Sequence, residues 1–385
     1  MPGAVGPQPV PTSRARRGAR TLCSAVLAVW AGAATGCEVD GEALLKGREP
    51  SPETEIDGNA NTAEVVAAAD AFLSTLSGEQ RSEALHEFRD EAKRTGWSYV
   101  PFDYLRRNGL ALADMDGEQR EAALSVMRAA LSEQGFRQLQ GIRAADARLA
   151  SIQESREDED DGGASPEAEG PEYGADLYAI AFFGEPDETS EFMIQFGGHH
   201  LAYNLTYGGG DVSMSPTLTA VEPVEFEWEG RSYAPLADSQ EATLSAVAAL
   251  TGAQRAAAEI ESENEDAFDH LTLGPGDSGP YPAPKGIVVA ELTEEQQDLV
   301  TAMVRTWVDD MDAESAERLV AKYVSEYDRT YLGWSGATDA DDVKTYVRLQ
   351  GPSVWIEYAN RPDRVMDGVH PHTVFRDRTS DYGWT

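Results

Sequence analysis

Histidine is the scarce residue of this sequence that is suited to chemistry. Only six histidines occur among 385 residues, and four of them lie in two short motifs, His199-His200 and His370-Pro371-His372. Imidazole nitrogens are common ligands of zinc and copper. Side chains two residues apart in an extended segment project to the same side. The second motif therefore predicts two nitrogens that are available to one metal ion.

The first motif can supply a third nitrogen. Strand alternation over residues 199–207 places His199 on one face and His200 on the other, more polar face. His200, His370 and His372 then form a three-nitrogen site for zinc or copper, open at a fourth position for water or substrate. The alternative is that these imidazoles hydrogen-bond one another and nearby carboxylates inside the core, without a metal.

Two carboxylates are candidates for proton transfer beside such a metal. Glu357 shares a predicted strand face with Trp355, and Asp377 follows the second histidine motif. Either carboxylate could be a fourth ligand, an orienting partner or a general base. A metal at this site would lower the pKa of bound water, and one of these carboxylates would transfer the proton. This combination would be typical of a hydrolase. We also expect the ligand pocket to be lined by His199, Asn204, Trp355 and Arg376.

A non-catalytic binding protein is the second class of function. In that interpretation a small ligand or partner binds an aromatic-rich region, and the histidines form only internal hydrogen bonds. Arg376 is then an internal partner of a neighbouring carboxylate and not a clamp for an anion. The aromatic region consists of Trp334, Tyr346, Trp355 and Tyr358.

The elements that position these residues are strands between two groups of helices. Runs of period two, typical of strands, are followed in one place by a glycine-rich hairpin at residues 208–211. Because the spacing lacks alternating βαβ units, we predict an α+β fold with a mainly antiparallel sheet flanked by N-terminal and central helices. The predicted strands are 177–183, 192–196, 199–207, 212–214, 345–349, 353–358 and 372–376.

Four helix starts share one pattern, an N-cap residue three positions before a glutamine, which is the capping-box arrangement. The first two starts are 39 residues apart and the last two 42, so the helical element is either duplicated or capped four times independently. Capping boxes stabilise helices and catalyse nothing. The four are Ser77 to Gln80, Asp116 to Gln119, Thr251 to Gln254 and Thr293 to Gln296.

The N-terminus has the pattern of an export signal. Four arginines, the last of them Arg20, precede an apolar stretch that closes on Ala34-Thr35-Gly36-Cys37, with no acidic residue before Glu38. We predict a lipoprotein signal peptide over residues 1–36, lipidation of Cys37 and membrane attachment through it. Ordinary cleavage and an uncleaved anchor are the alternatives. The protein would then lie in the cell envelope, outside the cytoplasm, at the inner or the outer membrane.

Composition bounds the remaining chain. After residue 36 it has 27 basic and 68 acidic residues, a formal charge of −41, which excludes nucleic acid as an expected partner because phosphates need basic patches. A small molecule or peptide is the expected ligand. We predict an acidic linker at 37–61 and one α+β domain at 62–385, with a helical part at 62–152, an acidic loop at 153–174 and a strand-rich part at 175–385.

Five motifs, at residues 97–102, 183–186, 198–204, 351–358 and 370–377, together resemble one known family. In this order and spacing they are similar to the bacterial domain of unknown function 3500 family, from about Ala63 to the end. The resemblance implies a secreted or lipid-anchored protein and no established activity. Pro371 departs from the family pattern, which has a small aliphatic residue there, and a proline removes a ladder amide.

Overall fold

The structure is a computed structural model that describes residues 60–159, 171–261, 271–274 and 280–384. Its helices are α1 (Thr62–Thr75), α2 (Gly78–Ala84), α3 (Ala92–Thr95), α4 (Gly117–Ala130), α5 (Glu133–Glu159), α6 (Ala237–Ala248), α7 (Gly252–Ala258), α8 (Glu294–Val308) and α9 (Ala313–Val324). Its strands are β1 (Leu85–His86), β2 (Leu110–Ala111), β3 (Tyr178–Phe183), β4 (Phe192–Gly198), β5 (Leu201–Gly208), β6 (Asp211–Ser213), β7 (Thr217–Ala220), β8 (Phe226–Trp228), β9 (Arg231–Tyr233), β10 (Ile287–Val288), β11 (Tyr331–Gly336), β12 (Thr345–Gln350), β13 (Val354–Pro362) and β14 (Val369–Asp377).

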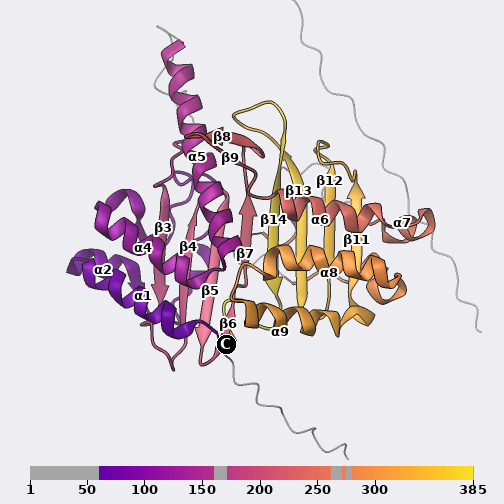
Figure 1. Cartoon of the computed structure of the whole chain (residues 1–385), viewed down its shortest axis with the longest axis horizontal. Coiled ribbons are helices and arrows are strands. Elements are labelled where there is room, and N and C mark those ends of the chain that lie inside the picture. The colour runs from indigo at the N-terminus through magenta and orange to yellow at the C-terminus, as the bar shows by residue number, and fades with distance from the viewer. Residues whose placement is uncertain (1–59, 160–170, 262–270, 275–279, 385) are drawn as a thin grey trace, which may run out of the picture. The chain divides into compact units, whose positions relative to one another are not determined.

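One large sheet organises these elements. Twelve strands form it in the order β1-β3-β4-β5-β7-β14-β13-β12-β11-β10, with β2 beside β3 and β6 beside β5. Every pairing is antiparallel except that of β1 with β3. Helices lie along one face of the sheet (Figure 1). The α+β prediction, with a mainly antiparallel sheet and N-terminal and central helices, is therefore confirmed.

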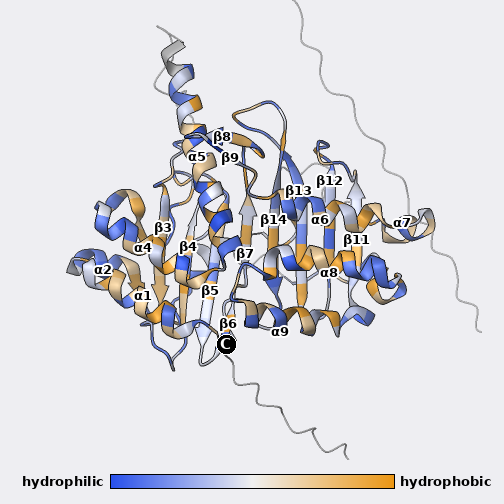
Figure 2. Cartoon of the chain, in the orientation of Figure 1, coloured by the Kyte–Doolittle hydropathy of each residue, from blue (hydrophilic) through white to orange (hydrophobic). Residues whose placement is uncertain are grey.

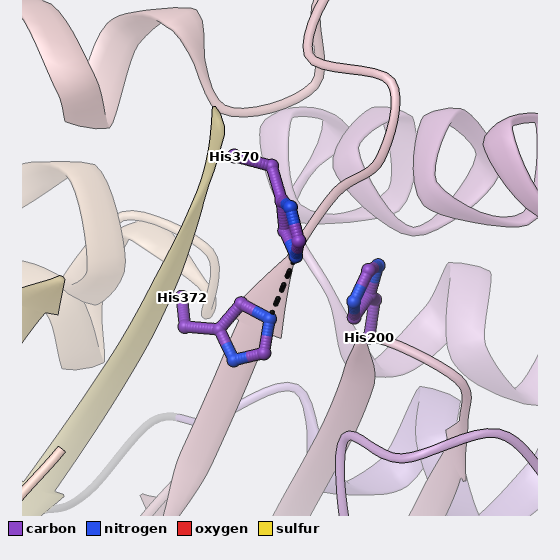
Figure 3. A group of neighbouring side chains, drawn as sticks. All are labelled: His200, His370 and His372. Atoms are coloured by element: carbon purple, nitrogen blue, oxygen red, sulfur yellow. Dashed lines mark hydrogen bonds between the residues drawn. The ribbon is translucent and has the colours of Figure 1, made fainter. Parts of the chain in front are cut away.

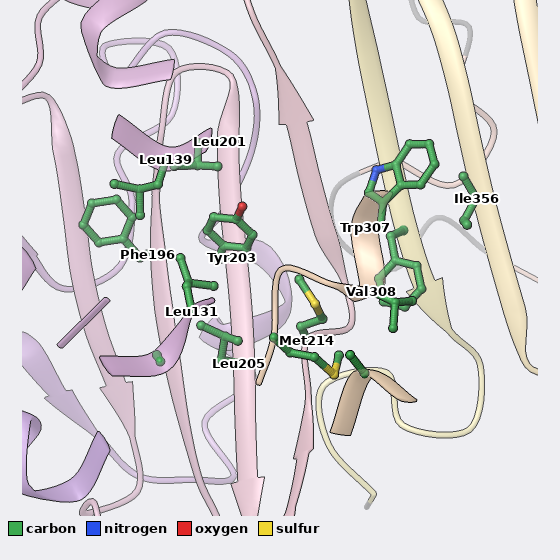
Figure 4. Close-up of a cluster of buried hydrophobic side chains, with 14 of the residues drawn as sticks. Leu131, Leu139, Phe196, Leu201, Tyr203, Leu205, Met214, Trp307, Val308 and Ile356 are labelled. Carbon is green, nitrogen blue, oxygen red and sulfur yellow. The ribbon is translucent and has the colours of Figure 1, made fainter. Parts of the chain in front are cut away.

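Both faces of the sheet are buried, because alternate side chains of each strand enter two different cores. On the helix face, Phe182 belongs to the same apolar cluster as Trp307 of α8. Figure 4 shows part of this cluster, including Trp307 and Phe196. On the other face, Phe183 packs with Trp97 and Tyr382, which come from loops and the C-terminal segment. The helices carry both apolar and polar residues, as amphipathic helices do (Figure 2).

All four predicted capping boxes are present, and their glutamines pair with one another. The Nε2 atom of Gln80 lies 3.1 Å from Oε1 of Gln119, and that of Gln254 lies 2.9 Å from Oε1 of Gln296. The second glutamine of each pair also donates to the end of an earlier helix, at the carbonyls of Thr75 and Ala249 respectively. The two helical groups are thus built alike.

The strand order repeats this correspondence. From the central pair β7–β14, the sheet continues outward through β5, β4 and β3 on one side and through β13, β12 and β11 on the other. At the centre, Thr219 stands opposite Thr373, and their hydroxyl oxygens lie 2.8 Å apart. We therefore describe the fold as two similar halves that meet at this pair, the arrangement expected of an internal duplication.

Several boundaries differ from the sequence predictions. Helix α5 continues to Glu159, so the predicted acidic loop at 153–174 begins as helix, because glutamate and arginine favour helix whatever their net charge. Strand β5 begins at Leu201, and His199-His200 form the turn before it. Several strands were not predicted. Among them are β7, which is short and threonine-rich, and β11, which contains glycines.

The predicted signal peptide, Cys37 and most of the acidic linker lie outside the described residues. Within the described ranges, no helix has both the length and the apolar character needed to cross a bilayer.

Candidate functional site

The two histidine motifs meet where the two halves of the fold meet. The His199-His200 turn joins β4 to β5, while His370 and His372 lie on β14, and both β5 and β14 pair with β7. One nitrogen each of His200, His370 and His372 lies within 4.8 Å of the others, and all three residues are buried. Figure 3 shows His370 and His372 on one strand with His200 facing them. The predicted three-nitrogen cluster therefore exists.

The spacing of the imidazoles is close to that of metal ligands. The Nε2 atoms of His370 and His372 lie 3.0 Å apart, and the ring centre of His200 is 5.0 and 5.1 Å from theirs. Two tetrahedral ligands at zinc–nitrogen distances of about 2.0–2.1 Å lie roughly 3.3 Å apart. The contact between His370 and His372 is a hydrogen bond, as the alternative without a metal expects. Coordination would replace this bond and would need the nitrogen of His200, which lies within 4.8 Å of the other two, to move closer.

Pro371 does not separate the two histidines. It stands opposite Asn360 on β13, and on its other side the pairing with β7 begins only at the next residue, His372. On the β7 side, Pro371 therefore has no paired residue whose hydrogen bond it would remove. Strands tolerate proline at such unpaired positions. His370 and His372 therefore keep the common face that the motif predicts.

His200 has an unusual backbone conformation. Its φ is 62°, in the left-handed region that costs a residue other than glycine about 1–2 kcal/mol. Two hydrogen bonds hold it there: its amide donates to the carbonyl of Tyr99 at 3.1 Å, and its carbonyl accepts from Ala220 at 2.8 Å. Outliers of this kind cluster at functional sites. The turn thus directs the His200 imidazole toward β14.

Carboxylates orient two of the histidines from behind. Oδ1 of Asp363 lies 2.9 Å from Nδ1 of His370, and Oδ1 of Asp146 lies 2.7 Å from Nδ1 of His199. The other oxygen of Asp146 accepts from the Tyr178 hydroxyl at 2.7 Å. A carboxylate on the far nitrogen is the usual support of a metal-binding histidine, because it fixes the ring and its tautomer.

Burial controls the charge of the cluster. It lowers the pKa of His200 and His372 well below the usual value, and the neighbouring histidines act in the same direction. The Nδ1 atom of His372 is buried and has no hydrogen-bond partner among the described residues. Neutral imidazoles are the form that coordinates metals.

A pocket of about 460 Å³ opens over the cluster. His199, as predicted, also lines it, and so does Glu222, which is buried. The volume is within the range of small-molecule sites. Its remaining lining residues include Tyr99, Tyr104, Tyr173, Arg156, Arg361 and Arg364.

Glu357 lies elsewhere, although its strand borders β14. Its two carboxylate oxygens accept from the amides of Thr272 and Leu273 at 2.6 and 2.9 Å and from the side chains of Tyr346 and Trp355 at 2.7 and 2.8 Å. It does not line the histidine pocket. In the structure, Glu357 anchors the segment containing Thr272 to the sheet.

Asp377 and Arg376 lie at the opposite end of β14 from His370. Asp377 accepts from Lys322 at 2.9 Å and from the Tyr323 hydroxyl at 2.8 Å. Arg376 is buried and forms an ion pair with Asp381 at 2.6 Å. Neither residue lines the pocket, and the internal ion pair is the alternative that the sequence left open for Arg376.

Asn204 and Trp355 are also absent from the pocket lining. Asn204 is fully buried, accepts from Gln195 at 2.7 Å and donates to the carbonyl of Pro216 at 2.7 Å. Trp355 and Tyr358 are 0% exposed. Tyr346 is also buried, and Trp334 is half-buried against the core on the helix face. Most of the aromatic-rich region is therefore core.

Sequence reasoning missed three acidic residues near the cluster, Asp146, Glu222 and Asp363. Each lies far from the histidines in sequence or in an irregular segment, so no spacing indicated it. Glu222, Asp363 and His370 form a second group whose ligand atoms lie within 4.8 Å of one another. For two of these residues the sequence offers one weak indication: a proline precedes Asp363 and another follows Glu222, and proline is typical of turns and loops.

Comparison with known proteins identifies the family. No curated protein and no solved structure matches the chain. The model of one family, described as a protein of unknown function, matches residues 58–384, which is most of the chain. The chain therefore belongs to the DUF3500 family, as the sequence motifs suggested.

Proposed function

We propose that this protein binds one transition-metal ion, zinc or copper, through His200, His370 and His372. The main support for this proposal is that three buried imidazoles from two distant motifs converge, with ligand atoms within 4.8 Å of one another. They also line a pocket. The left-handed backbone of His200 and the carboxylate behind His370 support the proposal, since both fix a ring toward the cluster.

Three protein ligands leave a fourth position that faces the pocket. A metal held in this way lowers the pKa of bound water to about 7 and polarises a bound oxygen, which is the chemistry of metal-dependent hydrolases. We therefore propose hydrolysis as the reaction class. The carboxylate in position to move a proton is Glu222, because it lines the pocket whereas Glu357 and Asp377 do not.

We further propose that the protein works in the cell envelope, attached to a membrane through lipidated Cys37. The arginine-rich start, the apolar stretch and the Ala34-Thr35-Gly36-Cys37 sequence support this proposal. Replacing Cys37 by serine should move the protein from the membrane fraction to the soluble fraction after cell lysis. Unchanged membrane attachment would contradict lipidation.

Elemental analysis tests the metal site. The protein, purified without a histidine tag, should contain about one equivalent of zinc or copper, and His200→Ala and His372→Ala should lose it while remaining folded. His86→Ala is the control, because His86 lies on β1 and stacks on Phe183, outside the cluster. Absence of metal after reconstitution would reject the metalloprotein and leave the histidines as structural groups in a binding protein.

A further inference from the structure

The lining of the pocket is richer in basic residues than the chain as a whole. The sequence has a formal net charge of −37. Yet Arg156, Arg361 and Arg364 line the pocket, and Glu222 is the one acidic residue among the described residues that line it. A cluster of guanidinium groups in a strongly acidic protein raises the local concentration of anions at one place on its surface.

Glu222 stabilises the loop that carries Arg364. Its Oε1 atom accepts from three successive backbone amides, those of Arg364, Val365 and Met366, at 2.9, 2.7 and 3.2 Å. These bonds spread the carboxylate charge over the loop between β13 and β14. They also hold in place the loop that carries Arg364, so the fold fixes the backbone position of this arginine relative to the histidines.

The arginines lie close to the histidine cluster. Arg361 is on β13, where it stands opposite His370 in the strand register. The charges of Arg361 and Arg364 both act on His372. An anionic group held between these guanidinium groups would lie beside the fourth position of the proposed metal.

Aromatic rings form the rest of the wall. Tyr99 packs edge-on against His372, with ring centres 4.8 Å apart, and Tyr173 packs against His199 at 5.0 Å. Tyr104 lines the same pocket and is 67% exposed, the most exposed of the large apolar side chains in the described ranges. Rings of this kind favour a planar or aromatic ligand body, while guanidinium groups favour carboxylate or phosphate.

We propose that the pocket binds a small planar organic anion, with its carboxylate or phosphate group against Arg361 and Arg364 and its body among the three tyrosines. The placement of the anion beside a metal rests on the function proposed above. Recognition by arginine and tyrosine does not, because these side chains line the pocket with or without an ion.

Fluorine NMR titration of the whole protein tests the proposal with three probes of one shape. They are 4-fluorobenzoate, 4-fluorophenylphosphonate and the neutral 4-fluorobenzamide. Both anions should bind at least tenfold more tightly than the amide. Whichever anion binds more tightly shows whether the pocket prefers a carboxylate or a phosphate-like group. Arg364→Gln and Arg361→Gln should each weaken anion binding about 10–100-fold and leave amide binding unchanged.

Arg231→Gln is the matched control, since Arg231 is also exposed but lines a different groove, beside the β8–β9 hairpin. It should change anion binding less than twofold. Equal binding of the amide, no binding of either anion, or equal losses in the control would overturn the proposal. Melting curves identify any variant that fails to fold, and the other of the two arginine variants then carries the test.

Metal-free and zinc-loaded samples separate this proposal from the metal site. Arginine-dependent anion binding in a protein that takes up no metal would support the anion pocket and reject the metalloprotein. Zinc uptake without any preference for anions would do the reverse. The two proposals therefore fail independently.

Discussion

The Nδ1 atom of His370 lies 2.9 Å from Oδ1 of Asp363, while Nε2 of the same ring faces His372 at 3.0 Å. One imidazole is thus held by a carboxylate on one side and presented to the cluster on the other. Because such a carboxylate fixes the ring and raises its basicity, Asp363→Asn should weaken zinc binding about 10–100-fold. Competition with a chromophoric chelator measures the affinity. Asp367→Asn, an exposed position in the same loop, should leave the affinity unchanged.

Glu357 should matter for folding and not for the metal. Glu357→Gln replaces one acceptor oxygen with an amide group that faces donors from the backbone and from Tyr346 or Trp355. Each buried donor left unpaired costs about 1–3 kcal/mol, so we expect the free energy of unfolding to fall by at least about 2 kcal/mol. Urea denaturation measures this loss, and elemental analysis of the folded variant should find the same metal content as in the wild type.

The exposed Glu188→Gln is the control for the same chemical change and should leave stability unaltered. Loss of metal from a folded Glu357→Gln protein would contradict the placement of Glu357 as a structural anchor. It would restore the sequence-based interpretation, in which Glu357 serves the histidine site.

The features that sequence predicted well are local. Capping boxes need only four neighbouring residues, and most long strands have a clear period of two, so both were found with small errors in their ends. The pairing of His370 with His372 was found for the same reason, since two residues on one strand share a face. Local patterns also identified the α+β class, because no βαβ spacing was present.

The site itself depends on contacts that no local pattern contains. Asp363 and Glu222 reach His370 from loops, and Asp146 reaches His199 from a helix. Glu357 has the right residue type and strand, but its carboxylate is already occupied by the segment containing Thr272. Side-chain type and strand face therefore indicated which residues were candidates, whereas the loops packed on the sheet decided which of them reach the pocket.

The paired glutamines of the capping boxes should be energetically coupled. Gln254 and Gln296 exchange hydrogen bonds in both directions at 2.9 Å. Each single alanine variant should lower the free energy of unfolding by about 1 kcal/mol, and the double variant should cost about 0.5–1 kcal/mol less than the sum. The corresponding pair, Gln80 and Gln119, should behave alike if the halves are equivalent. Strict additivity in both cycles would show that the reciprocal bonds contribute nothing.

Asp310 should give the protein a distinctive dependence of stability on pH. It is fully buried at the end of α8, and burial raises its pKa to about 7 despite hydrogen bonds from Tyr203, Gln134 and Gln138. Between the ordinary pKa of about 3.9 and pH 7, the folded protein therefore keeps a proton that the unfolded chain releases. The contribution of this group to stability is complete below about pH 4 and is lost as the pH rises toward 7, with a slope of at most about 1.4 kcal/mol per pH unit.

Asp310→Asn removes this titration and keeps a neutral side chain of the same shape. The difference in free energy of unfolding between the variant and the wild type should therefore move in favour of the variant from pH 4 to pH 7 and stay constant above about pH 8. Urea denaturation across this range measures it, with the exposed Asp341→Asn as the control, whose difference from the wild type should not vary in this way. Because other carboxylates titrate identically in both proteins, the comparison isolates Asp310, and a flat difference would mean that its carboxylate is ionised at all these pH values.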